Sequence, residues 1–146
     1  MNIRLENRDA FYVSGYLTET TYETHDKNIG SLWIQHEGKL RSVQGKGAPL
    51  YGATWYADNG ESYFYLLGID RQDQATIDES ATRVEIPSAL FAVATVPEGM
   101  PLLEAWTELF DKGLPSVGHA YIDGEKCFDF FGEGGVREIW IPVTKI

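Results

Sequence analysis

Asp129 is the residue whose type and surroundings most clearly indicate chemistry, because it is an acid within a very hydrophobic segment. The segment reads Cys127-Phe-Asp-Phe-Phe131, and such a density of aromatic residues is typical of a β-strand. Strand side chains alternate between two faces, so Asp129 shares its face with Cys127 and Phe131. A carboxylate among aromatic side chains is costly to bury unless a cation or a hydrogen-bond donor compensates it. We therefore expect Asp129 to contact a ligand; the alternatives are an exposed position or a pairing with a hydroxyl group or with Arg137.

A second acid lies on the strand that we expect at residues 136–143, after the turn Gly132-Glu-Gly-Gly135. Along this strand Glu138 and Trp140 share a face, so both are candidates for the ligand-binding site. The alternative for Glu138 is a salt bridge at the edge of a sheet. The alternative for Trp140 is packing in the core.

Aromatic side chains on other expected elements complete the candidate ligand-binding site. They are Tyr16, Tyr51, Phe64, Trp106 and Phe131. Trp106 and Trp33 lie on the apolar faces of expected helices, where packing of the helix on a sheet is the alternative. Phe64 and Tyr65 point to opposite faces of one strand, so we expect only one of them to meet the ligand directly.

A site of this composition favours an organic cation. A cation 4 Å from a carboxylate gains about 4 kcal/mol at an effective dielectric constant of about 20, before desolvation, and an aromatic face adds about 0.5–2 kcal/mol. A bare metal ion needs several hard oxygen ligands at fixed geometry. No pair of histidines has the spacing of a zinc site, and no serine, threonine or cysteine lies in a nucleophile motif. We therefore predict no catalytic residue, no metal site and no cofactor.

These residues need a sheet and helices to bring them together. The expected strands cover residues 11–17, 51–56, 62–69, 89–96, 127–131 and 136–143, and the expected helices cover residues 26–37 and 101–112. Residues 38–49 are expected to be irregular, and residues 70–80 to form a linker. The order strand, helix, strand, strand occurs twice, which predicts an internal repeat at about residues 10–70 and 82–146. An α+β fold with a mainly antiparallel sheet follows, because each half alone would leave an open sheet that needs a partner.

Length and charge limit the class of protein. A chain of 146 residues is expected to form a single domain, residues 1–146. The formal net charge of −10 argues against nucleic acid as a partner and fits cationic or basic partners better. No apolar run is long enough for a membrane span, and Cys127 is the single cysteine, which indicates a reducing environment. We expect a cytoplasmic protein with no membrane partner.

Four motifs of the chain are Val13-Ser-Gly-Tyr16, Ile29-Gly-Ser-Leu-Trp33, Tyr51-Gly with Tyr63-Phe-Tyr-Leu-Leu-Gly68, and Glu138-Ile-Trp-Ile-Pro142. Together they resemble the GyrI-like effector-binding domain family, which is named after the DNA gyrase inhibitor protein. The same family is related to the ligand-binding domains of multidrug-responsive AraC-type and MerR-type regulators. The resemblance implies two strand-helix-strand-strand modules related by a pseudo-twofold axis, with helices on one face. It also implies a groove between the modules that binds hydrophobic, often cationic molecules.

The family typically has Phe-Glu-x-Tyr where this chain has Phe128-Asp-Phe-Phe131. In the family the glutamate is the buried anion that meets a cationic ligand, so the resemblance gives Asp129 this role with a shorter side chain. The tyrosine hydroxyl of the family is missing at Phe131. Acids near the position of Glu138 also line the family's pocket, so Glu138 is expected to compensate.

Three functions compete. The leading expectation is non-enzymatic binding of hydrophobic, drug-like or dye-like cations by a stand-alone sensor or sequestering protein. The second is inhibition or protection of a protein partner such as DNA gyrase, which the family name and the acidic surface suggest. The third is hydrolysis of strained electrophilic compounds, because some relatives resembling this family open cyclopropane rings with an acid and aromatic residues.

Overall fold

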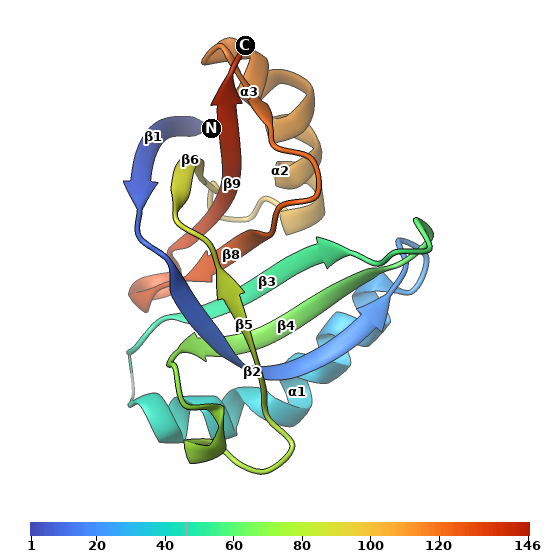
Figure 1. Cartoon of the computed structure of the whole chain (residues 1–146), viewed down its shortest axis with the longest axis vertical. Helices are drawn as coiled ribbons and strands as arrows, with labels where there is room; N and C mark the ends of the chain where they lie inside the picture. The colour runs from blue at the N-terminus through green and yellow to red at the C-terminus, as the bar shows by residue number, and fades with distance from the viewer. Residues whose placement is uncertain (46) are drawn as a thin grey trace.

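One long antiparallel β-sheet runs through the molecule, and helices pack on it in both halves (Figure 1). The computed structural model describes residues 1–45 and 47–146. In this part of the chain the sheet has nine strands: β1 (Asn2–Arg8), β2 (Phe11–Thr20), β3 (Leu50–Tyr56), β4 (Tyr63–Asp70), β5 (Thr82–Ile86), β6 (Ala89–Thr95), β7 (His119–Tyr121), β8 (Cys127–Phe131) and β9 (Arg137–Lys145). Their order in space is β1-β6-β9-β8-β3-β4-β2-β5, and β7 pairs with the C-terminal end of β9.

The main helices follow β2 and β6. Helix α1 (His25–Gln44) follows β2, while α2 (Leu102–Glu108) follows β6 and continues through a π-helical turn, η2 (Leu109–Gly113), into α3 (Leu114–Ser116). Short 3-10 turns, η1 (Gln74–Thr76) and η3 (Glu133–Gly135), precede β5 and β9. The expectation that the second helix ends near residue 112 is wrong, because the backbone of Gly113 keeps right-handed helical angles. None of the helices in the described residues is long and apolar enough to cross a membrane.

Helix α1 is longer than the sequence pattern indicates. It runs through residues 38–44, for which an irregular conformation is expected. Leu40 is fully buried, and Arg41 forms an ion pair with Glu37, one turn earlier, at 2.9 Å. The buried side chain and this pair stabilise the last turns of the helix, which outweighs the low helix propensity of Gly38.

The two halves of the molecule repeat one pairing pattern. Strands β2, β4 and β3 are neighbours in the first half, and β6, β9 and β8 are neighbours in the second. The halves join where β3 pairs with β8, with Ala53 opposite Phe128. Leu66 pairs with Ala53 and Trp140 pairs with Phe128, so Leu66 and Trp140 occupy equivalent positions. The α+β class with a mainly antiparallel sheet is confirmed.

Strands β1, β5 and β7 lie outside the predicted elements. Strand β1 pairs with β6 along its whole length at one edge of the sheet, and β5 pairs with β2 at the other. Charged residues such as Arg4, Arg8 and Arg83 interrupt the apolar pattern of β1 and β5. Charges are common on edge strands because they discourage association with other sheets. The same charges make these strands look like loops in the sequence.

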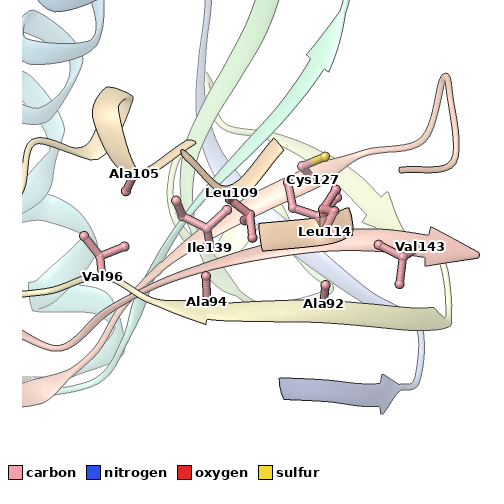
Figure 2. Close-up of a cluster of buried hydrophobic side chains, with 10 residues drawn as sticks. Ala92, Ala94, Val96, Ala105, Leu109, Leu114, Cys127, Ile139 and Val143 are labelled. Atoms are coloured by element: carbon pink, nitrogen blue, oxygen red, sulfur yellow. The ribbon is translucent and has the colours of Figure 1, made fainter. Parts of the chain in front are cut away.

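The core lies on both faces of the sheet. Figure 2 shows one buried cluster that includes Ala92 and Ala94 of β6, Ile139 of β9 and Leu109, which follows α2. A second cluster lies under α1 and includes Leu40. A third cluster, around Phe128, covers the opposite face. Buried side chains thus fix both helical segments against the sheet.

We expect Gly15→Ala to destabilise the fold. A Cβ atom on Gly15 would lie 1.9 Å from the carbonyl oxygen of Leu67, because β2 and β4 approach closely there. Forced overpacking of this kind costs about 1–3 kcal/mol, which a urea titration should show as a lower free energy of unfolding. The control is Gly30→Ala in α1, where a Cβ has no neighbour within 4 Å and helix propensity favours alanine. Equal stability of Gly15→Ala and the unchanged protein would contradict this account of the close approach.

Candidate functional site

A row of paired residues shows how the sheet places Asp129 between the two helices. Leu67 pairs with Gly52, Gly52 with Asp129, and Asp129 with Ile139. Directly paired residues share a face of the sheet. Leu67 belongs to the cluster under α1, and Ile139 belongs to the cluster under α2. Both helices therefore cover the same face, and Asp129 lies between them.

A cavity of about 690 Å³ opens on this face, over strands β3, β4 and β8. Aromatic residues are the largest group in its lining, which includes residues from both helices and from the sheet: Trp33, Tyr63, Tyr65, Trp106, Asp129 and Phe131. A volume of this size is typical of small-molecule sites, which combine apolar walls with a few polar groups.

Asp129 is a buried acid in this cavity. It is 3 % exposed, and its Oδ1 atom accepts a hydrogen bond of 2.9 Å from the indole Nε1 of Trp106. Among the described residues no cationic group lies within ion-pair distance of its carboxylate. Burial raises the pKa of Asp129 to about 8, and the hydrogen bond from Trp106 opposes that rise only in part. The carboxyl is therefore mostly protonated at neutral pH until a positive charge approaches it.

Gly52 and Tyr65 form the wall beside Asp129. A Cβ atom on Gly52 would lie 2.3 Å from the hydroxyl oxygen of Tyr65, so the tyrosine occupies the space that glycine leaves. The Tyr65 hydroxyl accepts a hydrogen bond of 3.2 Å from Nε1 of Trp33. Desolvation first, and then the charge of Asp129, raise the pKa of Tyr65. Each helix thus contributes one indole N–H to a buried oxygen of the sheet.

The open end of the cavity is also aromatic. The hydroxyl groups of Tyr22 and Tyr56 are joined by a hydrogen bond of 2.8 Å, and both side chains are exposed. Deeper in the cavity, Nδ1 of His25 is hydrogen-bonded to the hydroxyl of Tyr63. Desolvation is the main cause that raises the pKa of Tyr63 to about 12, so this phenol stays neutral.

Three of the eight predicted site residues line this cavity: Trp106, Asp129 and Phe131. Tyr16 lies under α1, where its ring stacks on His36 and its hydroxyl donates to Asp78. Phe64 stacks on Trp55, on the face opposite to Tyr65. Neither Tyr16 nor Phe64 is part of the lining.

The remaining three predicted residues, Tyr51, Glu138 and Trp140, also lie outside the lining, on the opposite face of the sheet. Asp129 pairs with Ile139, and the neighbours of Ile139 in sequence must point the other way. Glu138 accepts hydrogen bonds of 3.1 Å from both Arg4 and Trp140. The structure therefore supports the alternatives of a salt bridge for Glu138 and of core packing for Trp140.

The aromatic residues of the opposite face hold a cation of the chain itself. The guanidinium carbon of Arg8 lies 3.9 Å from the ring centroid of Phe11 and 5.2 Å from that of Trp140. Arg8 also donates a hydrogen bond of 3.3 Å to the hydroxyl of Tyr51. On this face the aromatic rings already have a cationic partner, Arg8, whereas the carboxyl group of Asp129 on the other face has none among the described residues.

Of Phe64 and Tyr65, one of which was expected to meet the ligand, Tyr65 lines the cavity. Other lining residues, chiefly Trp33 and Tyr63, were not among the predicted site residues. Trp33 fits the helix-on-sheet alternative as well, since its ring edge contacts Phe131. Tyr63 and Tyr65 share one face of β4, and the pairing of Tyr65 with Thr54 places that face with Asp129. Alternation counted through the paired strands, from Asp129 to Gly52 to the tyrosines, is the signal that would have found them.

The sequence belongs to a known family of effector-binding proteins. The model of the family Cass2, integron-associated effector binding protein, matches residues 4–143, so the chain is a member of this family. The resemblance to GyrI-like domains is thereby confirmed. A comparison with curated protein sequences gives no significant match.

Solved structures share the fold at low sequence identity. SAV2435 bound to tetraphenylphosphonium is 16% identical, with a TM-score of 0.79 over 99% of this chain and 94% of that one. An integron cassette protein from the mobile metagenome of Vibrio cholerae is 17% identical, with a TM-score of 0.74 over 97% of this chain and 95% of that one. A hydrolase from Listeria innocua is 12% identical, with a TM-score of 0.55 over 97% of this chain and 91% of that one. At these identities the likeness concerns the fold.

Proposed function

We propose that this protein binds hydrophobic organic cations in the cavity between α1 and α2, with Asp129 as the counter-charge, and acts as a sensor or sequestering protein. One observation carries the proposal: the buried carboxyl group of Asp129, which lines an aromatic cavity, has a hydrogen-bond donor but no cationic partner among the described residues. A bound cation would supply the positive charge that Asp129 lacks. The structure of SAV2435, which has the same fold and is bound to tetraphenylphosphonium, supports this class of ligand.

The energy balance favours a large, delocalised cation. Attraction between a carboxylate and a cation at 4 Å is worth about 4 kcal/mol at an effective dielectric constant of about 20. A small, strongly hydrated ion would lose more than this on entering the cavity. A lipophilic cation is weakly hydrated, and it gains further from the rings of Trp33, Trp106 and Tyr63.

Isothermal titration with two ions of equal shape tests the proposal. Tetraphenylphosphonium and tetraphenylborate have the same four rings and opposite charges. At pH 9, where Asp129 is ionised, we expect the phosphonium ion to bind with a dissociation constant in the micromolar range and the borate ion to bind at least about a hundredfold more weakly. Equal affinities would show that the cavity recognises only apolar surface, and the proposal would then fail.

A second function, acid-assisted hydrolysis of a strained electrophile, has one observation in its favour. The pKa of Asp129, about 8, keeps this buried carboxyl protonated at neutral pH, as a general acid requires. The hydrolase from Listeria innocua shows that a similar fold is found in an enzyme. The test is turnover of a cyclopropane-containing electrophile, followed by chromatography. Product formation that disappears in Asp129→Asn would favour hydrolysis over simple binding.

A further inference from the structure

Arg137 is a cationic residue of the cavity that the proposed function does not use. It lines the cavity that holds Asp129, and it also lines a shallower recess of about 600 Å³ on the outer side of Trp33 and Phe131. Its Nη2 atom donates a hydrogen bond of 2.9 Å to the carbonyl oxygen of Pro97. No carboxylate among the described residues lies within ion-pair distance of it. The guanidinium group therefore has unused donors at the edge of the cavity.

The register of the sheet fixes the spacing of Arg137 and Asp129. Asp129 pairs with Ile139, and Arg137 precedes Ile139 by two residues on the same face. Diagonal neighbours of this kind are about 7–8 Å apart between their backbones. Arg137 could thus reach toward Asp129, but its bond to Pro97 holds the guanidinium elsewhere. The two opposite charges stay separate, and a ligand can meet both.

Flat aromatic walls lie between the two charges. Phe131 pairs directly with Arg137 and lies on the same face as Asp129. Its ring meets Trp33 edge to face, with centroids 4.8 Å apart. A planar aromatic ligand that contacts these rings can hold one end near Asp129 and the other near Arg137.

We propose that Arg137 forms an anion subsite in this cavity, so that the preferred ligands are amphoteric aromatic molecules with a cationic group at one end and a carboxylate at the other. The proposal rests on the proposed cation binding at Asp129 and adds a second point of recognition. Arginine suits this role because its planar guanidinium binds carboxylates through two parallel hydrogen bonds.

The other charged residues near Arg137 do not compete with it for an anion. Arg41 also lines the outer recess, but it is paired with Glu37 at 2.9 Å. Glu133 lines the outer recess and not the inner cavity, whose acids are Asp129 and the exposed Asp111 and Asp123. An anion on the inner side of Arg137 therefore avoids Glu133, and solvent screens the charges of Asp111 and Asp123.

Two dyes that differ by one methyl ester test the proposal. Rhodamine 123 is a methyl ester and a cation, whereas rhodamine 110 carries a free carboxylate and is a zwitterion above neutral pH. Fluorescence anisotropy at pH 8.5 measures the affinity of both dyes for the unchanged protein and for Arg137→Gln. We expect Arg137→Gln to weaken rhodamine 110 binding by about fivefold or more, and to change rhodamine 123 binding by less than about twofold.

Two further variants serve as controls. Arg83→Gln makes the same change in net charge on β5, away from the cavity, and should leave both affinities unchanged. Arg137→Lys keeps the charge but not the planar fork, so it should retain part of the preference for rhodamine 110. Thermal unfolding of each variant shows whether loss of the Pro97 contact has disturbed the fold; if Arg137→Gln is unfolded, Arg137→Lys decides by the ratio of the two affinities.

The outcomes separate this proposal from the proposed function. Rhodamine 123 binding that Asp129→Asn weakens, together with equal effects of Arg137→Gln on both dyes, keeps the cation site and overturns the anion subsite. Absence of binding for both dyes overturns both proposals. A selective loss of rhodamine 110 binding supports the anion subsite.

Discussion

Asp129→Asn is expected to weaken tetraphenylphosphonium binding about tenfold to a hundredfold at pH 9, where the carboxyl of the unchanged protein is ionised. Asparagine has nearly the same size, and its side-chain oxygen can still accept the hydrogen bond from Trp106. The substitution therefore removes the charge and keeps the shape of the cavity. The Coulomb attraction of about 4 kcal/mol is partly offset by desolvation, which leaves a loss of this order. Isothermal titration calorimetry measures it.

Two exposed acids of the same cavity provide matched controls. Asp111 and Asp123 line the cavity, and both side chains face solvent. Water and salt screen such charges, so Asp111→Asn and Asp123→Asn should each change the affinity by less than about threefold. If all three substitutions weakened binding equally, the acidic surface as a whole would explain the attraction, and Asp129 would not be the specific counter-charge.

The same substitution should change stability with the opposite sign. The pKa of Asp129 in the folded protein, about 8, is above the ordinary value of 3.8, so the folded state holds this proton more tightly than the unfolded state. Between about pH 4 and pH 8 the free energy of unfolding therefore falls as pH rises, and it stays reduced above pH 8. Asp129→Asn removes this loss, so it should be more stable than the unchanged protein at pH 9. Urea titrations at pH 5 and pH 9 compare the two.

The elements of this fold follow from the sequence where apolar alternation is strong. The pairing of β8 with β9 is an example, because aromatic and β-branched residues fill both strands and glycines connect them. The charged edge strands β1 and β5 cannot be predicted in this way. They are held in place by pairing with β6 and β2, and their own composition does not indicate a strand. The repeated order of strands and helices was visible because each half carries the same sequence of apolar segments.

The candidate site was harder to predict, for a reason that lies in the strand register. Three of the predicted residues, Asp129, Trp106 and Phe131, line the cavity. Asp129 is the lone acid of its strand, and Phe131 shares its face by alternation within the same strand. Which face of β9 joins Asp129 depends on its pairing with Ile139, and a single strand does not reveal this. A shift of one residue in this register would place Glu138 in the cavity, where the structure has Arg137. For this reason Arg137 lines the cavity and the predicted Glu138 does not.

Affinity for a permanently charged cation should rise steeply with pH. In the free protein Asp129 is protonated below its pKa of about 8, and a cation binds best to the ionised form. Binding to the ionised form below pH 8 must therefore release a proton, so the affinity should rise by up to about tenfold per pH unit and level off above pH 8. If the protonated form binds as weakly as we expect for Asp129→Asn, the gain between pH 6 and pH 9 is about tenfold to fiftyfold. Tetraphenylphosphonium itself does not titrate, so the slope belongs to the protein.

The groups around Asp129 should not contribute to this pH dependence of the affinity. Burial raises the pKa values of Cys127, Tyr63 and Tyr65, so none of them loses a proton between pH 6 and pH 9. Trp106→Phe removes the hydrogen bond that holds the pKa of Asp129 down, and should move the levelling point to higher pH. Asp129→Asn should give a nearly flat profile. A full slope that persists in Asp129→Asn would assign the titration to another group of the protein, and Asp129 would then not be the counter-charge of the cation.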